Sequence, residues 1–299
     1  MTIDCVDMYV KQEPSLAILK QKWSKTLIGA SPLTGGLTNQ CWKVTTQCGR
    51  HYVWRPRSFS TETLSISRPH EYQILTALQQ ADFTPKVEAL FPEGLLVEWI
   101  DGVTLCDVTK GDNLDLVMKS LSDLHQYPWI IEPHSKIKEF DYRACIMAYW
   151  ASLPEQARTP IQTQRFERLY IESESLLQQT MVLEGACLCH FDLGDYNIIQ
   201  KPNAALVIID WEYAALSNPI IDITTSILAG QFDIDESLKS YSKNCNINLK
   251  SWTELVQRWV PFLRFMALLW HQVSLCLHER ASDRKAIEIL DNQLKADGF

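Results

Sequence analysis

The sequence has 299 residues, with 28 Lys and Arg against 36 Asp and Glu, so its formal net charge is −8. Hydrophobic residues make up 46% and charged residues 21%, which excludes a disordered chain and predicts two domains or one two-lobed unit. The acidic balance disfavours nucleic-acid binding, which normally needs a basic patch, but it is compatible with a cationic ligand or metal-bound phosphates.

The first hundred residues predict a small lobe rich in β-structure. After a helical lead-in to about residue 26, strands are expected at 41–46 and 51–55, joined by a turn at 47–50. In the second of these strands, Tyr52 and Trp54 share one face, and Val53 and Arg55 share the other. Pro69 begins a helix that runs to about residue 80, and strands follow at 87–90 and 95–100 around a turn at 92–94.

After residue 100 the pattern becomes mainly helical. Helices are expected at 114–124 and over 141–182, and again from Asp222 to the end. Between them lie short strands at 186–189, 198–199 and 206–209. The order predicts an α+β fold, with an N-terminal lobe over 1–100 and a larger helical lobe over 101–299.

The compartment is inferred from the first residues, the apolar windows and the cysteines. The start of the chain carries acids and no apolar core, so it does not look like a signal peptide. The most apolar window, 260–270, is interrupted by Pro261 and Arg264 and is better explained as a buried helix. The nine cysteines show no zinc-ligand spacing, and Cys187 and Cys189 are expected on opposite faces of a strand. We therefore expect a cytoplasmic protein with reduced, mostly buried thiols and no membrane partner.

The most informative stretch is HFDLGDYN at 190–197, followed by IDWEYA at 209–214. The two motifs place Asp192, Asn197 and Asp210 at the ends of a β-hairpin. A carboxylate and an amide oxygen side by side suit Mg²⁺, and Asp192 could accept a proton from an alcohol. These are the needs of phosphoryl transfer, and the alternative, an acidic surface hairpin, explains the pair of motifs less well.

These motifs resemble those of the aminoglycoside phosphotransferase and choline kinase group of small-molecule kinases, and the resemblance covers most of the chain. It implies the bilobal protein-kinase-like fold, with ATP and Mg²⁺ as cofactors. It also implies that Asp192 is the catalytic base and that Asn197 and Asp210 are the metal ligands. Asp195, Trp211 and Glu212 are then expected to bind the substrate, with a second metal as the alternative partner of Glu212, and Asp222 to support the catalytic loop.

The same resemblance assigns a nucleotide site to the N-terminal lobe. The residues assigned to it are Gly35, Gly36, Thr38 and Asn39 over the phosphates, Arg55 at the position of the kinase lysine, Glu71 as its helix partner, and Glu98, Trp99 and Ile100 at the adenine hinge. Arginine departs from the usual lysine, and Arg57 is the alternative to Arg55. The glycine pair alone is more typical of an ordinary turn, and Glu71 would also suit the N-terminus of a helix.

A small acceptor is favoured over a protein substrate. Phe191 stands where protein kinases have an arginine that reads a phosphorylated activation loop. Asp222 follows Asp210 too closely for the long segment that would hold a peptide.

The acceptor is expected to be a small, cationic alcohol. Ten tryptophans are many, and aromatic faces attract cations, although most of these rings are expected in the core. The helical lobe looks most like bacterial thiamine kinase, with choline or ethanolamine kinase and aminoglycoside-type phosphotransferase as alternatives. An inactive kinase-like binding module is the rival of another class, disfavoured because all three motif residues are present.

Overall fold

The computed structural model describes residues 6–23, 25–33, 41–108, 113–128 and 137–299. The described chain divides into two compact units. The first holds the described residues up to Val103 together with Ile199–Glu212, and the second holds the rest from Thr104 onward. The predicted lobe boundary at residue 100 stays a prediction. The stretch 199–212 associates with the first unit rather than with its neighbours in sequence.

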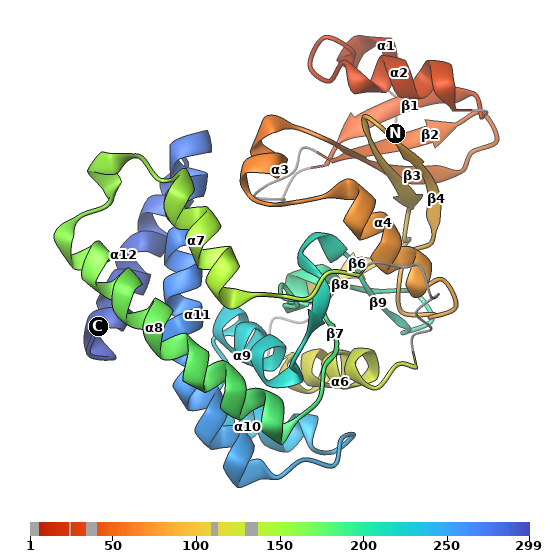
Figure 1. The fold of residues 1–299 in the computed structure, drawn as a ribbon. Coiled ribbons are helices and arrows are strands. Elements are labelled where there is room, and N and C mark those ends of the chain that lie inside the picture. The colour runs from red at the N-terminus through yellow and green to blue at the C-terminus, as the bar shows by residue number, and fades with distance from the viewer. Residues whose placement is uncertain (1–5, 24, 34–40, 109–112, 129–136) are drawn as a thin grey trace. The chain divides into compact units, whose positions relative to one another are not determined.

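The first unit is built on an antiparallel sheet in the order β1-β2-β3-β5-β4 (Figure 1). Its strands are β1 (Leu27–Pro32), β2 (Trp42–Thr46), β3 (His51–Pro56), β4 (Val87–Phe91) and β5 (Gly94–Glu98). Its helices are α1 (Val6–Tyr9), α2 (Ser15–Lys22), α3 (Phe59–Thr63) and α4 (Arg68–Ala77). The predicted strands and the helix from Pro69 are therefore present, and α3, which the sequence did not predict, begins at a Ser58 capping box.

The alternation in β3 sorts its side chains as predicted. Tyr52 and Trp54 are buried in a core that also holds Leu16 and Leu19 of α2. Arg55 lies on the opposite face of β3, where its side chain contacts the acidic residues described below.

The second unit is mainly helical. Its helices are α5 (Leu105–Val108), α6 (Leu114–His125), α7 (Tyr142–Ser152), α8 (Pro160–Leu183), α9 (Pro219–Gly230), α10 (Ile234–Tyr241), α11 (Leu249–His278) and α12 (Ala281–Ala296). The single helical stretch expected over 141–182 is two helices, because Pro154 disfavours helical geometry at Leu153 and Pro160 starts α8.

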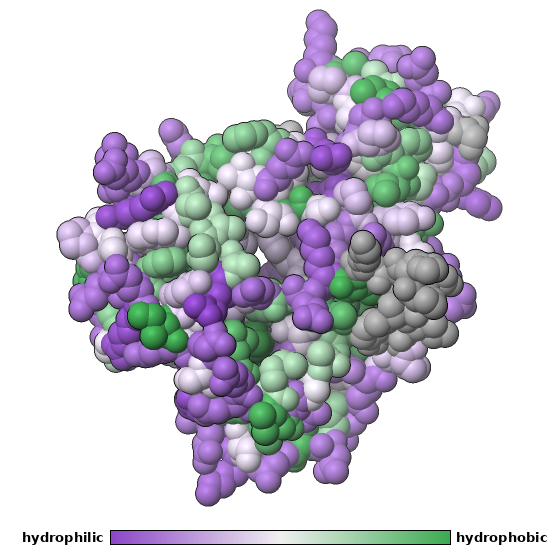
Figure 2. Space-filling model, viewed as in Figure 1, coloured by the Kyte–Doolittle hydropathy of each residue, from purple (hydrophilic) through white to green (hydrophobic). Residues whose placement is uncertain are grey.

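The long helix α11 is the centre of this unit and packs on α7, α8, α9, α10 and α12 (Figure 1). By length and hydropathy alone it could cross a membrane, but a long core helix passes the same test. Side chains such as Trp259, Phe265 and Leu269 are buried, so α11 is a core helix, as predicted. On the face shown in Figure 2, polar and apolar side chains are intermixed.

Short strands carry the motifs. β7 (Cys187–Cys189) pairs antiparallel with β10 (Ala215–Ser217), a strand that the sequence did not predict. β8 (Ile198–Gln200) and β9 (Leu206–Ile208) lie in a three-stranded sheet with β6 (Val103–Thr104). The motif HFDLGDYN therefore follows β7, and IDWEYA follows β9.

Two expectations about the cysteines were wrong. Residues i and i+2 of a strand share a face, so the Sγ atoms of Cys187 and Cys189 lie 3.7 Å apart rather than on opposite faces. The eight cysteines in the described part of the chain are free thiols, but among them only Cys189 is fully buried.

Candidate active site

The loop after β7 is held by a buried carboxylate. Asp222, in the first turn of α9, accepts hydrogen bonds from the backbone N–H groups of His190 (2.8 Å) and Phe191 (2.7 Å). Phe191 has a φ of 65°, which a bulky residue adopts only under constraint. Its ring packs on Phe140, with centroids 4.2 Å apart. Asp222 thus fixes a strained turn immediately before Asp192, consistent with the supporting role that the resemblance implied.

Asp192 is oriented by two neighbours on the same loop. The hydroxyl of Tyr196 donates to Asp192 Oδ1 at 2.7 Å, and Nδ2 of Asn197 donates to Oδ2 at 3.1 Å and to the Asp192 carbonyl at 2.8 Å. Gly194 is required here, since a Cβ at this position would lie 2.2 Å from the Tyr196 ring. The loop therefore presents a half-exposed carboxylate in one defined orientation, as a proton acceptor needs.

Asn197 suits a hard cation. Its side chain is buried and its amide nitrogen donates to Asp192, so the amide oxygen is the atom of this side chain that could bind a cation. On the first unit, Asp210 follows β9 with a φ of 66° and a side chain that is 25% exposed. An amide oxygen and a carboxylate are both donors that Mg²⁺ prefers, so each of these residues suits the predicted metal by its chemistry.

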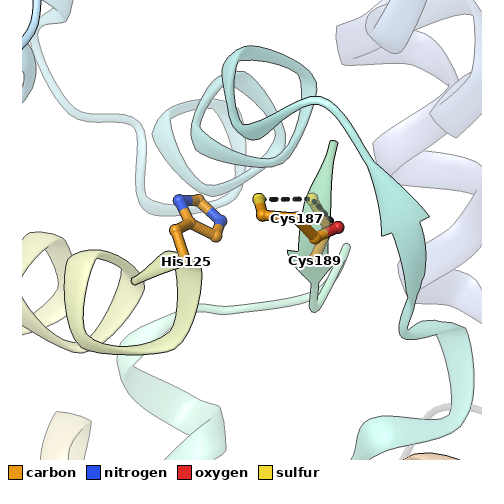
Figure 3. A group of neighbouring side chains, drawn as sticks. All are labelled: His125, Cys187 and Cys189. Carbon is orange, nitrogen blue, oxygen red and sulfur yellow. Dashed lines mark hydrogen bonds between the residues drawn. The ribbon is translucent and has the colours of Figure 1, made fainter. Parts of the chain in front are cut away.

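Asp222 is supported in turn by His125, at the end of α6. His125 Nε2 lies 3.0 Å from Asp222 Oδ2, and Nδ1 lies 2.8 Å from the Tyr241 hydroxyl. Figure 3 shows that the ring also faces the sulfur of Cys187, and the His125, Cys187 and Cys189 donor atoms lie within 4.8 Å of one another. Because both ring nitrogens already have partners, this arrangement is explained by support of the loop.

The pH dependence of folding tests this support. Burial lowers the pKa of His125, but Cys187 and the hydrogen bond with Asp222 outweigh burial and raise the pKa above its ordinary 6.5. A raised pKa means that the folded protein binds the proton more tightly, so this stabilisation is complete below about pH 6.5 and is lost as the pH rises through the folded pKa. Urea unfolding at about pH 6 and about pH 8.5 should therefore show a smaller loss of stability for His125→Gln than for the wild type.

The control for this measurement is His51→Gln. The His51 ring bonds the uncharged Thr45 hydroxyl, so this variant should keep the wild-type dependence on pH. Equal slopes for His125→Gln and the wild type would show that the His125–Asp222 pair does not contribute.

The first unit carries a buried ion network. Arg55 Nε lies 2.9 Å from Glu71 Oε1, and Arg55 Nη2 contacts both Asp210 and, at 2.9 Å, Glu212 Oε2. Arg68 Nη1 lies 2.7 Å from Glu71 Oε2 and 3.1 Å from Glu212 Oε2. Arg55, Glu71, Asp210 and Glu212 are thus brought together from segments far apart in sequence.

Arg57, the alternative to Arg55, lies outside this network and pairs with Glu62 on an exposed part of the chain. The strand register explains the difference. Arg55 is the last residue of β3 before Pro56, whereas Arg57 lies beyond the strand end.

The carboxyl of Glu212 has a strongly raised pKa. Burial and the nearby charge of Asp210 raise its pKa from 4.5 to about 7, while Arg55 and Arg68 oppose the rise. The two arginines therefore favour the ionised form of Glu212, which burial and Asp210 disfavour.

The predicted hinge lies at the end of β5. Glu98 is paired with Lys86 through the backbone and accepts from the Lys86 N–H with its side chain (3.1 Å). Trp99 donates to Asp101, its ring lies under the Lys43 ammonium, and Ile100 is buried. Gly35, Gly36, Thr38 and Asn39 lie outside the described residues.

Two predicted substrate residues have structural partners. Trp211 is fully buried and donates to the Ile208 carbonyl, so it packs in the first unit. Asp195 accepts from the Asn113 amide at 2.9 Å, which ties the loop to the start of α6. Their roles in substrate binding stay predictions.

Most aromatic side chains of the second unit belong to its core, as expected. Among those buried are Tyr142, Tyr149, Tyr241, Trp252, Trp259, Phe262 and Phe265. Trp150 stacks on Phe166, while the half-exposed Trp270 donates to the Tyr213 hydroxyl at 2.9 Å. Trp270 and Tyr213 thus present aromatic surface directly after the IDWE segment.

Sequence reasoning missed three residues of the site. Tyr196 lies inside the recognised motif and could have been assigned from it. Arg68 precedes Glu71 by one helical turn, a spacing typical of a helix ion pair, but its second partner comes from residue 212. His125 gave no local signal at all.

Comparison with known proteins agrees with these observations. Residues 30–276 match the family model for choline/ethanolamine kinase, and no curated protein matches. Among solved structures, the choline kinase LicA from Streptococcus pneumoniae is 18% identical with a TM-score of 0.74, covering 96% of this chain and 99% of that chain. A Plasmodium vivax ethanolamine kinase is 19% identical with a TM-score of 0.71, covering 97% and 92%.

A third structure is the GDP and kanamycin complex of APH(2″)-IIia, which is 18% identical with a TM-score of 0.63, covering 96% of this chain and 99% of that chain. At these identities the likeness establishes the fold, which is the predicted α+β, protein-kinase-like one. The family match extends over most of the chain and includes both motifs. The protein is therefore a small-molecule kinase and belongs to the choline/ethanolamine kinase family.

Proposed function

We propose that the protein transfers the γ-phosphate of ATP to the hydroxyl of a small amino alcohol, choline or ethanolamine. The observation that carries this proposal is the loop at 190–197, whose Asp192 is oriented by Tyr196 and Asn197 and held by Asp222. Such a loop provides a fixed carboxylate for an alcohol proton, and the family match supplies the class of acceptor.

In the proposed reaction the acceptor oxygen attacks the γ-phosphorus, and its proton passes to Asp192. The bond between the γ-phosphorus and the β,γ-bridging oxygen breaks, and ADP leaves with that oxygen. Asp192 contributes mainly by orienting the hydroxyl, because charge stabilisation and positioning dominate phosphoryl transfer.

The nucleotide is assigned to the first unit. Arg55 is proposed to contact the phosphates, with Glu71 as its partner, and the backbone around Glu98–Ile100 to bind adenine. A solved relative, LicA, is known in complex with AMP, which supports a nucleotide site in this fold.

Asn197 and Asp210 are the proposed ligands of Mg²⁺. Their oxygens fit this cation, as described above. Bound there, Mg²⁺ would neutralise phosphate charge and orient the γ-phosphate. Trp270 and Tyr213 are proposed to receive the cationic end of the acceptor, since aromatic faces attract an ammonium group.

The acceptor assignment departs from the first expectation. The resemblance to thiamine kinase rested on the helical lobe, whereas the matched family model is that of choline and ethanolamine kinases. Thiamine and aminoglycosides remain the alternatives. We also propose a cytoplasmic location, on the grounds of the sequence features given above.

An ATP-consumption assay with a panel of alcohols tests the acceptor. Choline or ethanolamine should give a kcat/KM at least about tenfold above those for thiamine, kanamycin and methylthioribose, because an enzyme discriminates between substrates by how tightly it binds their transition states. A preference for thiamine would overturn the assignment, and no turnover with any member of the panel would contradict the amino-alcohol class.

A further inference from the structure

The ion network of the first unit contains three charged groups in addition to the pair of Arg55 and Glu71. Two guanidinium groups and three carboxylates meet there, namely those of Arg55, Arg68, Glu71, Asp210 and Glu212. Arg68 is only 1% exposed, so it was buried at considerable cost in solvation. A second buried arginine at a nucleotide site calls for a physical explanation.

The two arginines are attached differently. Arg55 contacts Asp210, the carboxylate proposed to bind Mg²⁺, and its side chain extends from the end of β3. Arg68 is the first residue of α4 and is anchored to the network by Glu71 in the same helix and by Glu212. Its Nε also points to the Pro56 carbonyl, at 3.5 Å. Arg68 is thus held by the two buried carboxylates, whereas Arg55 also contacts a proposed metal ligand.

Glu71 and Glu212 each contact both arginines. Glu71 uses Oε1 for Arg55 and Oε2 for Arg68, whereas Glu212 meets both through Oε2. If Arg55 turned towards a phosphate, these two buried carboxylates would still be paired with Arg68. Without Arg68 the same movement would take both arginines away from these buried carboxylates, which is unfavourable in a buried position.

We propose that Arg68 is a positioning residue for nucleotide binding: it holds Glu71 and Glu212 so that Arg55 can exchange carboxylate contacts for the phosphates of ATP. The inference rests on the proposed function, in which Arg55 meets the nucleotide. Loss of Arg68 reduces the fraction of molecules in which Arg55 can make that exchange, and the apparent dissociation constant for ATP rises by the inverse of this fraction.

The test is the dissociation constant of ATP, measured by calorimetry, together with the KM for the acceptor. Arg68→Gln should raise the dissociation constant by at least about tenfold while the acceptor KM changes less than about twofold. Arg68→Lys keeps the charge but not the planar fork, so its value should lie between those of the wild type and Arg68→Gln.

The matched control is Arg165→Gln. Arg165 is also a buried arginine, paired with Asp291 between α8 and α12 of the second unit, so its loss should lower the unfolding temperature without weakening ATP binding. A role of Arg68 in stability alone would give the same pattern in Arg68→Gln, namely a lower unfolding temperature with an unchanged dissociation constant, and would overturn the proposal.

The outcomes remain distinguishable from failure of the proposed function. Failure of the wild type to bind ATP would remove the nucleotide assignment itself, and with it the role of Arg68. ATP binding that is equal in the wild type and the Arg68 variants would refute only the role of Arg68. If Arg68→Gln does not fold, Arg68→Lys decides, since wild-type ATP affinity in that variant would also overturn the proposal.

Discussion

Replacement of Asp192 by asparagine is expected to lower kcat by about a thousandfold, within the range observed for positioned acid–base groups. The amide has nearly the same shape as the carboxylate, but it cannot accept the acceptor proton. Tyr196 can still donate to the amide oxygen of the new side chain, which replaces one carboxylate oxygen. The Asn197 amide nitrogen would then face either that oxygen or the new NH₂ group. The loop should keep its fold, because the hydrogen bonds that the His190 and Phe191 N–H groups donate to Asp222 are unaffected.

The binding of ATP separates a chemical effect from a folding effect. Its dissociation constant in Asp192→Asn should stay within about twofold of the wild-type value, because the lost group acts on the transition state. Asp233→Asn is the control: Asp233 caps α10, asparagine caps equally well, and kcat should not change. A kcat near that of the wild type in Asp192→Asn would exclude Asp192 as the base.

The parts of the site that could be predicted are those encoded by consecutive residues. Asp192, Asn197 and Asp210 lie in two short motifs, and the loop geometry that they need is formed by near neighbours such as Gly194 and Tyr196. Arg55 was expected from the resemblance, and alternation in the strand agreed with its place on the face opposite Tyr52 and Trp54. Its choice over Arg57 depended on where the strand ends, and sequence patterns define such ends poorly.

The parts that could not be predicted depend on contacts between distant segments. Arg68 and Glu212 are 144 residues apart, and His125 and Asp222 are 97 apart. Hydrophobic periodicity predicts which face of an element is buried, but not which charged groups meet there. The burial of Trp211 likewise depends on its place in the fold, and its expected contact with the substrate stays a prediction.

Asp210→Asn should remove the contribution of Mg²⁺ to ATP binding. In the wild type, we expect ATP to bind more tightly with Mg²⁺ than without it, because a cation held by Asp210 screens the phosphates from Glu71 and Glu212. The variant should lose this difference, and its kcat should fall by at least about a hundredfold.

The same substitution should have a different effect on the affinity for ATP when Mg²⁺ is absent. Asp210 contacts Arg55, so its carboxylate competes with the phosphates for the same guanidinium. Neutralising Asp210 weakens that competition and removes a negative charge from the network, so ATP alone should bind at least as tightly to Asp210→Asn as to the wild type.

Calorimetric titrations with and without Mg²⁺ measure both effects, and Asp82→Asn, at an exposed aspartate of the same unit, is the control. An unchanged Mg²⁺ dependence in Asp210→Asn would refute the metal assignment, whereas equal weakening with and without Mg²⁺ would mean that Asp210 acts by holding Arg55 in place.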